Sequence, residues 1–230
     1  MKIGIKNVVK NIINAAFPAN CRGCGEKGEF LCERCKKYIS ENMKVREIEG
    51  AVFLGFRDEI LGEMIEEAKY ESVRGLLMEI AEVVYRGYFE NLKGAAVLVP
   101  MPTSRKHVRE RAIDHMDVIC REVARRSGGK IEKVRLLKRA KDTVQVGASS
   151  AVRRKQAKEA VELDEKVLRK YAREVRERQV ILMDDVWTTG ASLTEAGKIL
   201  KKAGASSLTL LTITKNRPRK RPVIRRGEID

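Results

Sequence analysis

The chain lacks any long hydrophobic run. In 230 residues, no stretch approaches the ~20 consecutive apolar residues that a membrane-spanning helix needs. Near the start, Lys10 and Asn11 interrupt the apolar residues of MKIGIKNVVKNIINAAF, so this segment lacks the continuous apolar core of a signal peptide. Its spacing predicts an amphipathic docking helix instead. We therefore expect a cytoplasmic protein with no membrane span.

Aromatic residues and glutamine are also scarce. Aromatic residues make up 5% of the chain, which leaves few platforms on which nucleic-acid bases could stack. Few amides and 35% charged residues are typical of a heat-adapted protein. Heat adaptation does not explain 48 basic against 32 acidic residues, a net charge of +16. This excess indicates a polyanionic partner, either nucleic acid or a small phosphorylated ligand, or else a solvated basic surface without a partner.

Four of the five cysteines form a C-x2-C-x7-C-x2-C array: Cys21, Cys24, Cys32 and Cys35. Paired C-x2-C spacing with four thiolates is typical of a closed structural zinc site. The alternative is two disulfides, which are rare in the cytoplasm outside hyperthermophiles. Cys120 shares a predicted helical face with apolar residues, so we expect it in the core.

The rest of the chain alternates predicted strands with predicted helices. This order favours an α/β fold with a parallel sheet. Strands are expected at 51–56, 95–100, 134–138, 159–163, 180–183 and 207–215, and helices at 60–68, 73–84, 115–126 and 192–204. We divide the chain into an amphipathic helix and zinc module (1–48), a helical connecting region (49–93) and a domain with a basic C-terminal tail (94–230).

The stretch VILMDDVWTTGAS, residues 180–192, places Asp184 and Asp185 at the end of a buried strand. Ligands of open parallel sheets bind at the carboxyl ends of the strands. The backbone of a glycine-containing loop at a helix start, with nearby hydroxyl groups, binds phosphate. We therefore predict that the acids bind ribose hydroxyls and the loop binds a phosphate, through Thr188, Thr189, Gly190, Ala191 and Ser192. Trp187 is either a stacking surface or a hydrophobic plug.

This stretch resembles the phosphoribosyl-pyrophosphate (PRPP) signature of type I phosphoribosyltransferases. Together with the cysteine array, FRDEILGEMIEEAKY, VLVPMPTSRKHVRERA and LLKRAKDTVQ, all in the same order, it resembles the ComF family. That resemblance implies a type I phosphoribosyltransferase fold joined to an N-terminal four-cysteine zinc module. It adds a pyrophosphate loop at Pro102, Thr103 and Ser104, and catalytic cations at Arg105, Arg111 and Lys138 or Arg139, with no choice between the last two.

The resemblance implies Mg²⁺-dependent transfer of phosphoribose from PRPP to a nitrogenous acceptor. The alternative is a non-catalytic or PRPP-regulated single-stranded-DNA-binding protein acting in competence. The chain departs from the family's R-G-F-N-Q pattern, with Ala112, Ile113, Asp114 and His115 after the arginine. No general base is evident, and His107 and His115 are expected at the surface or at a helix start. The acceptor stays open, and a homodimer is a further candidate assembly.

Overall fold

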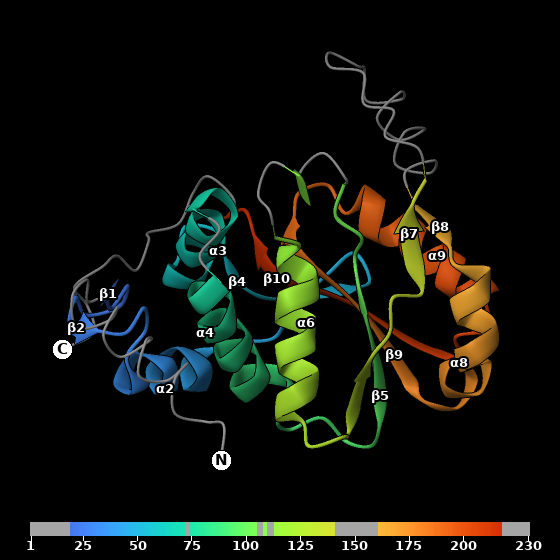
Figure 1. The fold of residues 1–230 in the computed structure, drawn as a ribbon, viewed down its shortest axis with the longest axis horizontal. Coiled ribbons are helices and arrows are strands. Elements are labelled where there is room, and N and C mark those ends of the chain that lie inside the picture. The colour runs from blue at the N-terminus through green and yellow to red at the C-terminus, as the bar shows by residue number, and fades with distance from the viewer. Residues whose placement is uncertain (1–18, 72–73, 105–107, 110–112, 141–160, 218–230) are drawn as a thin grey trace, which may run out of the picture.

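A computed structural model describes residues 19–71, 74–104, 108–109, 113–140 and 161–217. Its centre is a six-stranded sheet in the order β3-β4-β10-β9-β5-β6 (Figure 1). The strands are β3 Arg46–Ile48, β4 Ala51–Phe56, β5 Ala96–Pro100, β6 Ile131–Lys133, β9 Gln179–Trp187 and β10 Ser207–Lys215. Neighbouring strands are parallel except for the edge strand β3, which pairs antiparallel with β4. The predicted α/β fold with a parallel sheet is confirmed.

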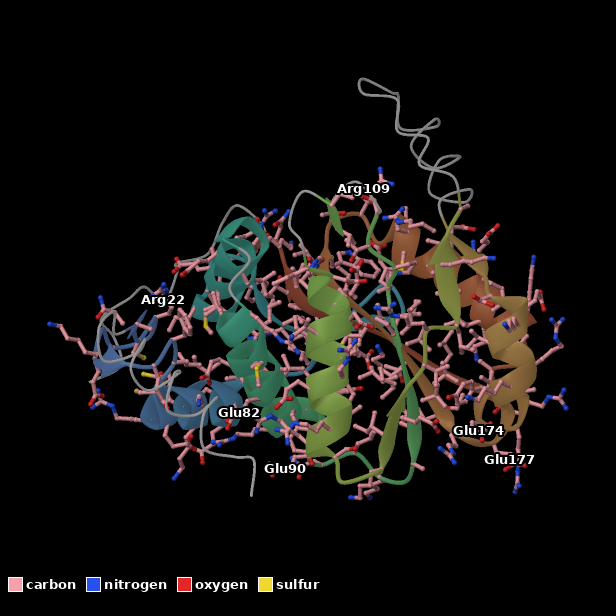
Figure 2. All side chains as sticks on the ribbon, viewed as in Figure 1. Arg22, Glu82, Glu90, Arg109, Glu174 and Glu177 are labelled. Carbon is pink, nitrogen blue, oxygen red and sulfur yellow. The ribbon has the colours of Figure 1, made fainter. Side chains whose placement is uncertain are left out.

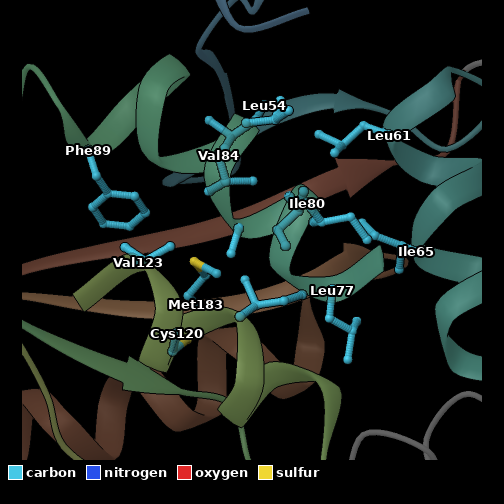
Figure 3. Close-up of a cluster of buried hydrophobic side chains, with 14 of the residues drawn as sticks. Leu54, Leu61, Ile65, Leu77, Ile80, Val84, Phe89, Cys120, Val123 and Met183 are labelled. Carbon is cyan, nitrogen blue, oxygen red and sulfur yellow. The ribbon is translucent and has the colours of Figure 1, made fainter. Parts of the chain in front are cut away.

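Apolar side chains alternate along the central strands and form one core on each face of the sheet. In β9, Ile181 and Met183 join one core, whereas Val180 and Leu182 join the other. Figure 3 shows the first core, where Met183 lies among residues of the helices and Cys120 is buried as predicted. This core is covered by α3 Ile60–Glu71, α4 Arg74–Val84 and α6 His115–Arg126, and the second by α8 Glu165–Glu177 and α9 Ala191–Lys202.

The cysteine-containing segment forms a small module at one end of the molecule (Figure 1). It consists of β1 Ala19–Asn20, β2 Lys27–Gly28 and α2 Glu33–Asn42. Helix α2 packs against α4 and the π-helix η1 Tyr85–Phe89, and Leu31 and Cys35 are buried in the first core. Ion pairs reinforce this contact: the Lys36 Nζ lies 2.6 Å from Glu79 and 3.5 Å from Glu82, which is labelled in Figure 2. The module is thus packed onto the sheet domain.

Some elements differ from the predicted ones. Of the strand expected at 134–138, only residues 137–138 lie in a strand, β7 Leu137–Arg139, because the central sheet ends with β6 at Lys133 and the chain leaves it there. β7 pairs antiparallel with β8 Val161–Leu163 in a separate two-stranded ribbon. Within the predicted connecting region, β4 is a strand of the central sheet. The amphipathic segment 1–18 and the tail 218–230 lie outside the described residues. No helix of the described part is long and apolar enough to cross a membrane.

Candidate functional site

The two acids lie at the carboxyl end of β9, between β10 and β5. The strand continues through both of them to Trp187, with Asp184 paired to Thr212 of β10. Successive residues of a strand point to opposite faces of the sheet. Asp185 therefore shares the face of Met183, toward α3 and α6, whereas Asp184 shares the face of Leu182. Both acids lie at the carboxyl end of the parallel strands, where the sequence predicts them, but they have different surroundings.

Asp185 is held by the buried His115 and by Lys69, whose side chain is 12% exposed. The Lys69 Nζ lies 2.6 Å from its Oδ2, and the His115 Nε2 lies 2.8 Å from the same oxygen. Burial opposes ionisation of Asp185, but the hydrogen bond with His115 and the charge of Lys69 outweigh it and lower the pKa of this carboxyl. Asp185 is therefore an ionised, fixed carboxylate. His115 does begin α6, yet it is buried in the site rather than exposed.

Asp184 has a higher pKa than Asp185. Burial and the neighbouring charge of Asp185 raise the pKa of Asp184 to about 7. Its Oδ1 accepts a hydrogen bond from the backbone N–H of Asp185 at 3.0 Å. Among the described residues, the Oδ2 of Asp184 and the Oδ1 of Asp185 have no hydrogen-bond partner. Each acid thus offers one carboxylate oxygen to a ligand.

The loop after β9 has the form expected of a phosphate cradle. Thr188, Thr189 and Ser192 are exposed, and no side chain caps the start of α9. Gly190 has a φ of +70°, and a Cβ there would overlap the indole of Trp187. Trp187 is only 3% exposed, so it is the hydrophobic plug under the loop and not a stacking surface. The helix start therefore presents free backbone N–H groups and hydroxyls to solvent.

The predicted pyrophosphate loop follows β5, the neighbour of β9. The Thr103 Oγ1 donates to the Oδ1 of Asp114 at 3.0 Å, and Asp114 caps α6. The Arg139 Nε donates to the Pro102 carbonyl at 2.9 Å, whereas the Nζ of the half-exposed Lys138 pairs with Glu162 at 3.3 Å. Of these two cations, Arg139 is the one that touches the loop. Ser104 continues the loop, and Arg105, Arg111 and His107 lie outside the described residues.

The four cysteines of the array lie together in the module. Their Sγ atoms are all within 4.8 Å of one another, and the Sγ atoms of Cys24 and Cys32 are 3.6 Å apart. All five cysteines of the chain are free thiols, so the disulfide alternative is not adopted. A hydrogen bond from the backbone of Glu26 and another from Arg34 lower the pKa of Cys24 to about 6. This donor set can hold one zinc ion with a closed coordination sphere.

The described residues form an α/β protein with an acid pair at a strand end, an uncapped helix start beside it and a four-cysteine module. No protein-family model matches the chain. It is similar to Competence protein F of Haemophilus influenzae, with 25% identity over 200 residues that cover 84% of this chain and 82% of that protein. This match confirms the predicted resemblance to the ComF family.

Solved structures to which the chain is similar include hypoxanthine phosphoribosyltransferases. A hypoxanthine phosphoribosyltransferase of Staphylococcus aureus is 12% identical, with 69% of this chain and 71% of that chain covered and a TM-score of 0.37. The Trypanosoma cruzi hypoxanthine phosphoribosyltransferase is 14% identical, with coverage of 69% and 72% and a TM-score of 0.38. The fold class rests on the parallel central sheet itself.

Proposed function

We propose that the protein binds PRPP with Mg²⁺ and transfers phosphoribose to a nitrogenous acceptor. One observation carries the proposal: each acid of the pair offers one oxygen beside an uncapped helix start with exposed hydroxyls. The oxygens of Asp184 and Asp185 bind the two ribose hydroxyls. The loop from Thr188 to Ser192 binds the 5-phosphate through its backbone N–H groups and hydroxyls.

The second loop and the cations serve the leaving group. A nitrogen of the acceptor attacks C1 of the ribose, the bond from C1 to the pyrophosphate oxygen breaks, and the proton of the acceptor nitrogen is released. The negative charge that grows on pyrophosphate is stabilised by the loop 102–104 and by Arg139, together with Arg105, Arg111 and Lys138 as further candidates. Bound Mg²⁺ would supply additional positive charge on the pyrophosphate. The zinc of the module is structural in this proposal.

Calorimetric titration of PRPP with Mg²⁺ into wild type and Asp184→Asn tests the proposal. Asp184 is the sharper target because Asp185 also carries the ion pair with Lys69. Loss of a charge-assisted hydrogen bond costs roughly 1.5–3 kcal/mol, so we expect the affinity to fall at least about tenfold. Glu177→Gln, which removes a carboxylate from α8 (Figure 2), is the matched control and should bind like wild type. The proposal is contradicted if wild type does not bind PRPP, or if the Asp184→Asn variant binds PRPP as tightly as wild type.

A second candidate function is binding of single-stranded DNA. It is favoured by the net charge of +16 and by the similarity to a protein named for competence. Because the chain has few aromatic side chains, contacts would be made mainly to phosphates and would be independent of sequence. The two functions are compatible, since PRPP and DNA need not share one surface. A homodimer stays a prediction.

A further inference from the structure

Two side chains from outside the loop 188–192, one buried and one largely buried, meet a single oxygen of Asp185. Lys69 comes from α3 and His115 from α6, with side chains 12% and 8% exposed. We propose that Lys69 and His115 are positioning residues of the PRPP site, which fix Asp185 so that its other oxygen meets a ribose hydroxyl. The inference rests on the proposed function and names residues that neither the loop nor the acid pair contains.

The hydrogen bonds of Asp185 support this role. Its backbone N–H donates to Asp184, its carbonyl accepts from the Thr214 Oγ1 at 3.1 Å, and its Oδ2 meets both Lys69 and His115. Among the described residues, its Oδ1 alone has no partner. Two backbone hydrogen bonds hold the main chain, and two contacts to Oδ2 leave the carboxylate little freedom to rotate, so its remaining oxygen has a set direction. Groups held in this way lose little entropy when a ligand binds.

Lys69 also forms an ion pair with a residue of its own helix. Its Nζ lies 3.1 Å from the Glu66 Oε1, and Glu66 pairs with Arg57 at 2.9 Å. On the same helix, Glu67 pairs with Arg22, which lies between two cysteines of the module, through the Nε at 2.6 Å and through the Nη2. Helix α3 therefore contacts the cysteine module at Glu67 and the acid pair at Lys69. The region before residue 94 contributes directly to the site.

If Lys69 positions Asp185 for the ligand, removing Lys69 should change the pH dependence of PRPP binding. If its ion pair only stabilises the fold, that pH dependence should not change. Asp185 faces Lys69 of α3, His115 of α6 and the neighbouring Asp184 of β9. Glu66 of α3 pairs with Lys69, and Arg139 of β7 acts on Asp184. If Lys69 is removed, burial still opposes ionisation but less positive charge compensates it, so the pKa of Asp185 rises. PRPP binding should then be lost at a higher pH on acidification.

The experiment is titration of PRPP with Mg²⁺ between about pH 3 and pH 8 into wild type, Lys69→Met and Lys69→Arg, because the pKa of Asp185 in wild type lies below its ordinary value of 3.8. We expect the acid-side loss of affinity in Lys69→Met to move up by roughly one pH unit, which is about tenfold in affinity at a fixed acid pH. Lys69→Arg retains the charge and should restore the wild-type profile. Lys36→Met removes another buried, ion-paired lysine, 7% exposed and in contact with Glu79, and should leave the profile unchanged.

Asp184 also responds to Lys69, so the profiles are repeated with Asp184→Asn in every variant. The shift should persist there, because Asp185 is then the remaining acid of the pair. Thermal melts report folding, and if Lys69→Met does not fold, His115→Ala removes the other donor and should shift the profile in the same direction. An unshifted profile in a folded variant overturns the inference alone. Wild type that binds no PRPP at any pH overturns the proposed function, and the inference falls with it.

Discussion

At the residue scale, two adjacent aspartates occupy one strand end with opposite protonation behaviour. Lys69 and His115 favour the ionised form of Asp185, whereas burial and the charge of Asp185 disfavour the ionised form of Asp184. A pair with one ionised and one readily protonated carboxyl carries less mutual repulsion than two full charges at adjacent positions. Such a site is poised to take up positive charge or hydroxyl donors from a ligand.

The raised pKa of Asp184 predicts how the stability of the ligand-free protein depends on pH. The pKa is raised from 3.8 to about 7, so the stabilising contribution of Asp184 is fully present below pH 3.8 and is lost as the pH rises to about 7. Asp184→Asn stays neutral throughout. The melting temperature of wild type, measured by differential scanning calorimetry, should therefore fall relative to Asp184→Asn between these pH values. The difference should then stay constant at higher pH.

The same measurement on Glu177→Gln controls for the loss of one carboxylate from the surface. Above pH 7, PRPP with Mg²⁺ should reduce the difference in melting temperature between wild type and Asp184→Asn. The reason is that the ligand offers hydrogen-bond donors to the charged Asp184 of wild type, which the variant lacks. A difference that is the same at all pH values would show that Asp184 ionises in the folded protein as it does in the unfolded chain.

At the element scale, the strands with continuous apolar runs are those that the sequence predicts well. AVFLGF, AVLVP and SLTLLTITK form β4, β5 and β10 because both faces of these strands are covered. The prediction for β9 ends at Met183, but the strand continues to Trp187 because β10 pairs with its polar end. Helix α8 is not predicted, since its sequence EKVLRKYAREVRE offers a narrow apolar stripe on a highly charged segment.

The acid pair and the phosphate loop could be predicted because they are contiguous in the sequence. The partners of Asp185 could not, because nothing local links it to His115, which is 70 residues away. The choice of Arg139 over Lys138 depends on strand alternation in β7, which points adjacent residues to opposite sides. One signal for Lys69 was present: a lysine among the apolar residues of a buried helical segment needs an acidic partner.

The cysteine module predicts a specific dependence of stability on metal. Metal analysis of protein purified without chelator should give about one zinc per chain. Removing zinc with a chelator should lower the melting temperature. Leu31 and Cys35 of the module are buried in the first core, and α2 packs against α4, so loss of the metal disturbs this packing. Cys120→Ser changes a cysteine outside the array and should leave the zinc content unchanged. Metal-free protein that is indifferent to chelator and contains two disulfides would contradict the prediction.

At the scale of the whole molecule, the basic tail starts beside the candidate site. Arg217 follows β10, stacks on Phe56 at 4.2 Å, and pairs with Asp58 at 3.0 Å and Glu59 at 2.7 Å. These contacts hold Arg217 just after Lys215, which pairs with Trp187 at the same end of the sheet as the acid pair. A truncation should therefore retain Arg217, so that its contacts to the loop after β4 survive.

Deleting residues 218–230 tests whether the tail binds single-stranded DNA. The deleted segment contains five of the basic residues: Arg219, Lys220, Arg221, Arg225 and Arg226. Each phosphate contact on single-stranded DNA adds ~0.7 to the slope of log affinity against log salt, so five contacts would account for up to about 3.5. Fluorescence anisotropy with labelled oligonucleotides should show weaker, less salt-dependent binding by the truncated protein, equally for all sequences. Its PRPP affinity should match wild type, because the truncation leaves the acid pair and the phosphate loop intact. An unchanged salt slope assigns the DNA contacts to the folded domain, and absence of binding at low salt removes DNA from the partners of this protein.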